Sequence, residues 1–351
     1  MISHRSHNLV SIPWAQTKTG LEFVNSRCFG RHQVSTPAFV DLKNMRALTL
    51  IYWKLIQSIQ TRWLRYGLYF LCSPLPLKCL PACLLTLLSF SLYANHLSGL
   101  SLVSAAIVGW FSAAFWLHYD DLWDQQVDQI NHPQRPLASG AIHQRGAIVA
   151  TLLAFLTANS AAWAMGYRAW GFTLFHLGLA LIYPLLCRLQ KVLANLVGAW
   201  TMLTPQVLFG PFIAASGWDA FCVFVLCLYP LSVGTQLQLD MADVKGDREL
   251  GLRTFVIMYG KDNTYTAILA CIVVSCLVFF LFGISNLHTL AGFTIYVAIY
   301  SFALINLIYS NEQGDAHQDF LYQIEYASRG VILAVLLGLI APMPWADRLL
   351  G

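Results

Sequence analysis

The chain has 351 residues, of which 57% are hydrophobic and only 11% are charged. A soluble domain usually carries about 25% charged residues and exposes a large surface that needs polar cover. This composition excludes a disordered chain and argues against a water-soluble globular enzyme. The mean hydropathy of +0.59 is typical of an integral membrane protein. The sequence shows no basic face with interleaved aromatic residues, so it does not predict nucleic-acid binding.

The N-terminal part divides into two segments by composition. Residues 1–44 are polar, poor in acids and without the apolar core that a secretory signal needs, so they fit a plain tail or a transit peptide. Residues 45–75 are aromatic and basic, which favours an amphipathic segment lying along a membrane surface. Residues 76–347 then form the predicted transmembrane domain.

Beyond residue 75, apolar runs recur that are long enough to cross a bilayer, which takes about 20 residues each. We predict an all-α integral membrane protein with about nine transmembrane helices. Basic residues gather in the segments on one side of these spans, which favours a cytosolic location for that side, or a matrix or stromal one behind a transit peptide. The predicted spans are 76–94, 101–119, 147–165, 170–187, 194–215, 220–239, 265–283, 289–309 and 329–346.

Two acidic clusters follow the second and sixth predicted spans and would face the same side. The first reads HYDDLWDQQVD and the second QLDMADVKGD. In each cluster three aspartates are separated by three and then four residues, which on an α-helix places their carboxylates on one face. The first triad is Asp121, Asp124 and Asp128, and the second triad is Asp240, Asp243 and Asp247.

Carboxylates gathered this closely repel one another unless a cation neutralises them. Mg²⁺ is usually bound by one or two carboxylates together with substrate phosphates. We therefore expect the two triads to coordinate Mg²⁺ and to grip a diphosphate between them, which would lead to diphosphate ionisation. Solvated helix ends and a cation-transport pathway are alternative interpretations of the same acids.

Basic residues accompany both acidic clusters. Arg135 lies between two prolines in NHPQRPLASG, and Lys245 and Arg248 lie in DVKGDRELG. A cation beside a departing diphosphate would stabilise the negative charge that develops on it. We expect these three side chains to bind phosphate, with a positive-inside membrane anchor as the competing explanation.

The two clusters resemble the motifs of the UbiA superfamily of intramembrane prenyltransferases. That family's first motif, N-D-x-x-D-x-x-x-D followed by N-x-P-x-R-P-x-x-S-G, is similar to residues 120–128 and 131–140. Its second motif, D-x-x-D-x-x-x-D with G-D-R and G-x-x-T, is similar to residues 240–254. The likeness extends over roughly residues 60–346. It implies helices ringed around a central cavity, closed on the cytosolic side by cap helices and open sideways to lipid.

The resemblance also implies a function and roles for particular residues. The implied function is the Mg²⁺-dependent transfer of an isoprenyl group from an isoprenyl diphosphate donor to a hydrophobic or aromatic acceptor. The transfer would pass through an ionised allyl cation. Carried onto this sequence, the six triad aspartates would coordinate Mg²⁺, and Arg135 and Arg248 would lie near phosphate. The family's Y-P-x-x-K-R segment matches Tyr183, Pro184 and Arg188, and Tyr183 would hydrogen-bond the donor.

The sequence departs from the family pattern at the substrate site. Asp120 stands where the family has Asn and is expected to touch substrate. Cys187 replaces a diphosphate-binding Lys, a role that Arg188 or Lys191 would take over. The stretch before the first motif lacks the Arg-x-x-G-C of 4-hydroxybenzoate enzymes, so that acceptor is not assumed. CDP-alcohol phosphotransferases are disfavoured because their D-G-x-x-A-R opening is absent.

Asp120 also completes the string DDLWD, which resembles the D-D-x-x-D of terpene synthases. A UbiA-type terpene cyclase is therefore the runner-up function, and a cation-coupled carrier is the third. An aromatic-lined cavity would serve transferase or cyclase, because aromatic faces stabilise cations. His118 would accept the proton lost after bond formation. Polar residues in the spans would orient an acceptor, namely Asn195, Gln206, Gln236 and Gln238.

Overall fold

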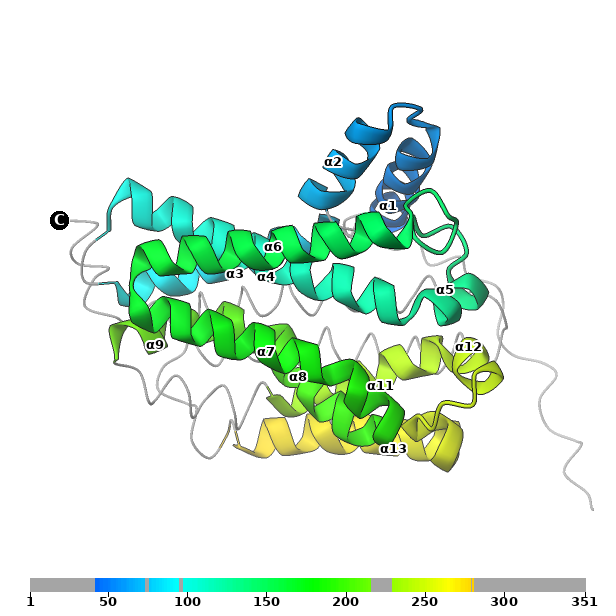
Figure 1. Ribbon diagram of the computed structural model, residues 1–351. Helices are drawn as coiled ribbons and strands as arrows, with labels where there is room; N and C mark the ends of the chain where they lie inside the picture. The colour runs from blue at the N-terminus through cyan, green and yellow to red at the C-terminus, as the bar shows by residue number, and fades with distance from the viewer. Residues whose placement is uncertain (1–41, 73–75, 95–96, 216–228, 279, 281–351) are drawn as a thin grey trace, which may run out of the picture. The chain divides into compact units, whose positions relative to one another are not determined.

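A computed structural model of the protein describes residues 42–72, 76–94, 97–215, 229–278 and 280. Every regular element in these ranges is a helix and none is a strand, which confirms the predicted all-α class (Figure 1). The predicted spans at 289–309 and 329–346, the beginning of 220–239 and the polar tail up to residue 41 lie outside these ranges.

Four of the described helices are long and apolar enough to cross a membrane, so the chain is a multi-pass membrane protein. They correspond to four of the predicted spans, whereas the total of nine is not confirmed within the described ranges. The four helices are α4 (Gly99–Trp123), α6 (Gln144–Met165), α7 (Tyr167–Leu189), whose apolar part ends at Cys187, and α13 (Phe255–Val278), which is kinked at Gly260.

Helix α4 begins at a capping box and ends later than predicted. Ser98 Oγ accepts a hydrogen bond from the Ser101 N–H, and Ser101 Oγ accepts one from the Ser98 N–H. The helix continues to Trp123, four residues beyond the predicted end of the span at 119. The apolar run stops where Asp120 and Asp121 begin, but the helical backbone does not, so α4 carries the first acidic residues.

The remaining apolar segments form shorter helices. The segment predicted as one span at 194–215 forms two helices separated at Leu208. Pro211 has no N–H to donate to the Val207 carbonyl, which interrupts the helical hydrogen-bond ladder at this point. The helices are α3 (Pro76–Tyr93), α8 (Lys191–Val207), α9 (Phe209–Ala214) and α11 (Tyr229–Ala242), which covers the end of the predicted span 220–239.

Helix α6 shows how the bundle packs. Its buried positions are mostly alanine, and most of its exposed positions are large and apolar. Small residues let neighbouring helices approach closely, as in membrane proteins generally, and α6 packs against α4 and α7. The buried alanines are Ala147, Ala150, Ala154, Ala158 and Ala162, and the exposed apolar residues include Val149, Leu152 and Leu156.

Two helices, α1 (Leu42–Ser58) and α2 (Arg62–Cys72), occupy most of the segment predicted to be amphipathic at 45–75. They have large exposed apolar side chains, of which Trp63 at 86% exposure is the most open. They also have fully buried ones, Ile56 and Tyr69, which pack toward α6 and the loop after α5. The buried apolar residues hold this hairpin against the rest of the protein. The exposed ones fit the predicted membrane-surface location, which stays a prediction.

Two short helices build the site. The helix α5 (Gln125–Asn131) follows α4, and α12 (Val244–Glu249) follows α11. These two short helices pack against each other, which brings the ends of α4 and α11 together (Figure 1).

Candidate functional site

Each acidic triad is bent at its middle aspartate. Asp124 (φ −92°, ψ 10°) separates α4 from α5, and Asp243 (φ −95°, ψ 4°) separates α11 from α12. The expectation of one continuous helix under each triad is therefore wrong, because each triad is divided between two helices. Aspartate is a poor residue for a helix interior because its carboxylate competes for nearby backbone groups. At both bends the backbone N–H still bonds the carbonyl four residues earlier, so the chain kinks without opening a loop.

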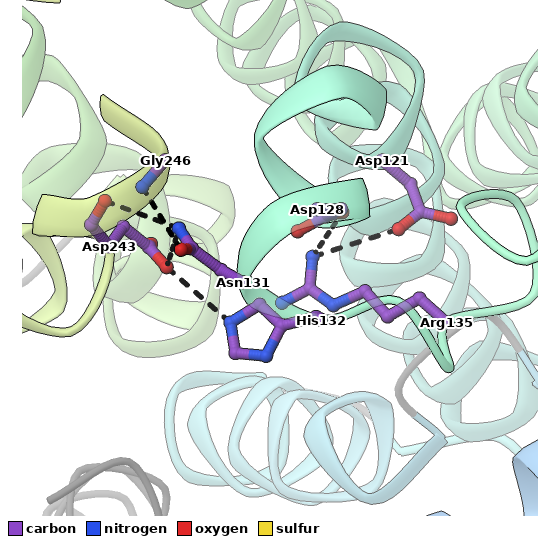
Figure 2. A network of polar contacts seen from close by, with 7 residues as sticks. All are labelled: Asp121, Asp128, Asn131, His132, Arg135, Asp243 and Gly246. Carbon is purple, nitrogen blue, oxygen red and sulfur yellow. Dashed lines mark hydrogen bonds and ion pairs between the residues drawn. The ribbon is translucent and has the colours of Figure 1, made fainter. Parts of the chain in front are cut away.

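The two outer aspartates of the first triad are buried and partly charge-compensated. Asp121 and Asp128 are only 2% and 3% exposed. Arg135 Nη1 lies 2.7 Å from Asp128 Oδ2 and 3.7 Å from Asp121 Oδ1, between the two carboxylates (Figure 2). The Tyr69 hydroxyl, from α2, donates a hydrogen bond to Asp121 Oδ2 at 3.1 Å. The loop predicted to bind phosphate through Arg135 thus folds back onto the triad that precedes it.

One guanidinium does not neutralise this cluster. Burial raises the pKa of Asp128 well above its usual range, and Arg135 opposes that rise. The neighbouring carboxylates Asp121, Asp124 and Asp243 raise the pKa of Asp128 further. A bound cation would favour the ionised form of these carboxylates.

Asn131 joins the two triads, as Figure 2 shows. Its side-chain amide donates to the backbone carbonyl and to Oδ1 of Asp243, both at 3.2 Å, and its Oδ1 accepts from the Gly246 N–H at 3.1 Å. His132 Nε2 lies 3.4 Å from Asp243 Oδ1. A Cβ at Gly246 would lie 2.7 Å from Asn131 Nδ2 and 3.0 Å from Val127, so only glycine fits this approach.

In the second triad, the contacts that the structure gives are to side-chain amides and a histidine ring. Asp240 and Asp247 are 5% and 2% exposed, and Asn195 Nδ2 from α8 donates to Asp240 Oδ2 at 2.6 Å. Lys245 and Arg248, predicted to bind phosphate, extend exposed side chains from α12. The predicted acceptor-orienting residue Asn195 is thus a direct partner of the triad.

Tyr183 lies beside the second triad's supporting helices. Its ring is buried, with its centroid 4.9 Å from that of Trp116. A Cβ at Gly198 would lie 2.9 Å from the Tyr183 ring and 3.2 Å from the Gln236 side chain, so α7, α8 and α11 meet here. Gln238 is also buried, and neither its amide nitrogen nor its oxygen has a partner among the residues that the structure describes.

The other predicted site residues lie around this centre or outside the described part of the structure. Asp120 is half-buried near the end of α4. His118 is fully buried, with its ring centroid 4.6 Å from that of Tyr69. The side chains of Arg188, Lys191 and Gln206 lie outside the described part of the structure, so their roles stay predictions.

The donor set fits a hard divalent cation. Within the described ranges, no group of three or more His, Cys, Asp or Glu side chains is arranged to hold a metal ion by itself. Mg²⁺ does not require such a cage, because it usually takes one or two carboxylates and completes its coordination with water and substrate phosphates. The two neighbouring triads offer six carboxylates, and Arg135 contacts two of them, Asp121 and Asp128.

Sequence reasoning did not assign roles to Tyr69, Asn131 and His132. Asn131 was recognisable, because it follows Asp128 by three residues and so extends the helical spacing of the first triad. Tyr69 carried no such signal, since its partner lies 52 residues away.

Comparison with known sequences identifies the family. The model of the UbiA prenyltransferase family matches residues 82–325. A digeranylgeranylglyceryl phosphate synthase from Pyrococcus furiosus is 30% identical over 172 residues, which are 45% of this chain and 59% of that protein. The enzyme of the same name from Haloquadratum walsbyi is 29% identical over 199 residues, covering 56% of this chain and 68% of that protein. The chain therefore spans little more than half of the Pyrococcus relative's length.

Solved structures share the fold. A UbiA homolog from Aeropyrum pernix K1 in its apo form superposes with a TM-score of 0.57 at 19% identity, covering 76% of this chain and 96% of that one. A UbiA homolog from Archaeoglobus fulgidus bound to DMAPP and Mg²⁺ superposes with a TM-score of 0.54 at 15% identity, covering 78% and 99%. Together with the family match over residues 82–325, this places the chain in the UbiA prenyltransferase family.

Proposed function

We propose that this chain is a Mg²⁺-dependent intramembrane prenyltransferase that moves an isoprenyl group from an isoprenyl diphosphate to a hydrophobic or aromatic acceptor. The observation that carries the proposal is the junction of two aspartate triads through Asn131 at the ends of α4 and α11. Family membership supports it, as does the related Archaeoglobus protein that binds DMAPP and Mg²⁺.

The chain's own residues account for binding and orientation. Asp121, Asp124 and Asp128 from one triad, with Asp240, Asp243 and Asp247 from the other, would hold Mg²⁺. When bound, Mg²⁺ supplies positive charge that stabilises a diphosphate leaving group. Exposed Lys245 and Arg248 would contact the outer phosphate oxygens from α12.

The bond changes follow from this binding mode. The C1–O bond of the donor breaks, its electron pair leaves with the diphosphate, and the resulting allyl cation is captured by an acceptor that then loses a proton. The packed rings of Trp116 and Tyr183 would face this cation, since aromatic faces attract positive charge and the buried Tyr183 ring is shielded from water. His118 is a less suitable proton acceptor than its sequence position suggested, because its ring is fully buried under Tyr69.

A UbiA-type terpene cyclase is the second candidate. It is favoured by Asp120, which completes DDLWD. The aromatic pair Trp116 and Tyr183 would also suit it, by stabilising an allyl cation that a double bond of the same isoprenoid captures. In either case we propose that the triads face the cytosol, or the matrix or stroma if residues 1–44 are a transit peptide.

The test uses the full chain purified in detergent. It is incubated with Mg²⁺ and labelled farnesyl or geranylgeranyl diphosphate, first alone, then with a phenol, and then with geranylgeranylglyceryl phosphate, because the relatives are named digeranylgeranylglyceryl phosphate synthases. Released diphosphate and hexane-extractable products are measured, with EDTA as the control.

Each arm has its own outcome. A prenylated product that appears only with an added acceptor supports the transferase and identifies the acceptor class. A cyclic hydrocarbon formed without acceptor replaces the transferase by the cyclase. Absence of diphosphate release in every arm overturns both enzymes and leaves a carrier.

A further inference from the structure

A side chain of the N-terminal hairpin reaches the acidic site. Tyr69 on α2 is completely buried, and its hydroxyl donates to Asp121 Oδ2 at 3.1 Å. The other oxygen of the same carboxylate, Oδ1, lies 3.7 Å from Arg135 Nη1. The Tyr69 hydroxyl therefore occupies one oxygen of Asp121 and leaves the other directed toward the charged centre of the site.

The rest of the hairpin is anchored to the loop that carries Arg135. Gln57 Nε2 of α1 donates to the Gln134 carbonyl at 3.1 Å, and Arg65 Nη1 of α2 donates to the Ala141 carbonyl at 3.1 Å. Ile56 of α1 packs in one apolar cluster with Leu137 and Ile142 from the same loop. These contacts fix the position of α1 and α2 against the first triad and hold the Tyr69 hydroxyl in place.

The chemistry of a tyrosine side chain suits this role. A phenol hydroxyl is protonated near pH 7, so Tyr69 orients Asp121 by donating a hydrogen bond to it and does not replace it as an anionic ligand.

We propose that Tyr69 is a positioning residue that orients the Asp121 carboxylate for divalent-cation binding, which makes the α1–α2 hairpin a working part of the site. The inference rests on the proposed function. Hydrogen-bond partners behind a metal-binding carboxylate commonly set metal affinity, because they fix the rotamer of the ligand. Tyr69 lies outside the residues 82–325 that the family model matches, so this support comes from the segment that precedes the family core.

The variant Tyr69→Phe tests the inference because it keeps the buried ring and removes only the hydroxyl. The matched control is Tyr66→Phe on the same helix, whose hydroxyl accepts a backbone hydrogen bond from the His143 N–H at 3.4 Å. Mn²⁺, as a spectroscopic substitute for Mg²⁺, is titrated into the full-length protein in detergent, and free Mn²⁺ is followed by electron paramagnetic resonance. Thermal unfolding of each variant is recorded in parallel.

We expect Tyr69→Phe to weaken Mn²⁺ binding roughly tenfold, as is typical when an outer hydrogen-bond partner of a metal ligand is lost. Tyr66→Phe should stay within about twofold of the wild type, since its hydroxyl touches only backbone. In the activity assay, the half-saturating Mg²⁺ concentration of Tyr69→Phe should rise by the same factor, and kcat should recover at saturating Mg²⁺.

Several results would overturn the inference. Unchanged Mn²⁺ affinity in Tyr69→Phe would do so, as would equal weakening in both tyrosine variants, which would indicate general loosening of the hairpin. If Tyr69→Phe unfolds, the independent variant Asp121→Asn must weaken Mn²⁺ binding with α2 untouched, and normal binding would refute the role of Asp121. A wild-type protein that binds no Mn²⁺ and releases no diphosphate would instead refute the proposed function itself.

Discussion

The two triads have the same spacing and the same bend, yet their surroundings differ. In the first triad, Asp121 and Asp128 are buried around the guanidinium of Arg135. In the second triad, Asp240 accepts a hydrogen bond from Asn195, and Asp243 contacts Asn131 and His132. The basic side chains of α12 are exposed. Equal sequence patterns thus give one triad gathered around a guanidinium and one followed by two exposed basic side chains on α12.

This difference suggests a division of labour. Buried charge needs compensation in the folded protein, so we expect Arg135 to serve stability in addition to the phosphate contact proposed for it. The outward cations of the second triad contribute little to stability and are available to a charged ligand instead. Variants of the two halves should therefore separate stability from substrate binding.

The largest effect is expected at the two bends. Asp124→Ala and Asp243→Ala should each reduce kcat by about 10²–10³-fold, because each removes a charged group that would help stabilise the leaving diphosphate. Both side chains are half-buried, so the melting temperature should change little. Product formation is measured alongside thermal unfolding.

The control for these variants is Asp262→Ala, an exposed acid on α13 outside the triads. It should retain full activity. Near-wild-type turnover in either Asp124→Ala or Asp243→Ala would show that the metal-binding assignment is wrong.

The internal cation of the first triad should matter most for stability. Arg135→Gln leaves Asp121 and Asp128 buried without their guanidinium, and breaking a buried ion pair in this way costs about 3 kcal/mol. Arg248→Gln, on the exposed face of α12, should change the free energy of unfolding by less than about 0.5 kcal/mol. The melting temperature in detergent, with and without Mg²⁺, measures both.

Added Mg²⁺ should recover part of the stability lost in Arg135→Gln, because a bound cation replaces the missing charge and stabilises the state that binds it. Equal melting temperatures for the Arg135 and Arg248 variants would remove the distinction between the two triads.

The bundle was largely predictable because membrane helices are encoded locally. Long apolar runs gave α4, α6, α7 and α13 to within a few residues at most ends, although α13 begins ten residues before the predicted 265. The end of α4 was missed because hydropathy falls at Asp120 while the backbone stays helical. The break at Leu208 was missed because the run 194–215 is apolar on both sides of Pro211.

The site was predictable in its residue types but not in its assembly. The spacing of the triads can be read from the sequence, whereas the packing of short α5 against short α12 beyond the bends at Asp124 and Asp243 is a tertiary contact. The Asn131 contacts with α12 span more than a hundred residues, so no local pattern indicates them. Tyr69 likewise reaches Asp121 only through the packing of the hairpin.

The docking of the two halves can be broken at Gly246. In Gly246→Ala the new Cβ would lie 2.7 Å from Asn131 Nδ2 and 3.0 Å from Val127, so the Asn131 side chain must move from its present contacts with α12. We expect a loss of about 1–3 kcal/mol in stability, typical of an overpacked contact, and roughly tenfold lower activity. The control is Gly171→Ala on α7, where no atom lies within 4 Å of the new Cβ. If Gly246→Ala matched that control in both measurements, the two triads would not need the Asn131 junction.

The smallest effect should come from the exposed cation Lys245. Lys245→Ala should raise the KM for the isoprenyl diphosphate about threefold and leave kcat and the melting temperature unchanged, since an exposed charge contributes well under 1 kcal/mol to stability. The KM difference should shrink at high ionic strength, because salt screens exposed charges. Lys54→Ala on α1, equally exposed but on the N-terminal hairpin, serves as the control for a general loss of positive charge. Equal KM values for wild type and Lys245→Ala at low salt would show that α12 does not meet the diphosphate, and the outward cations of the second triad would then be membrane anchors only.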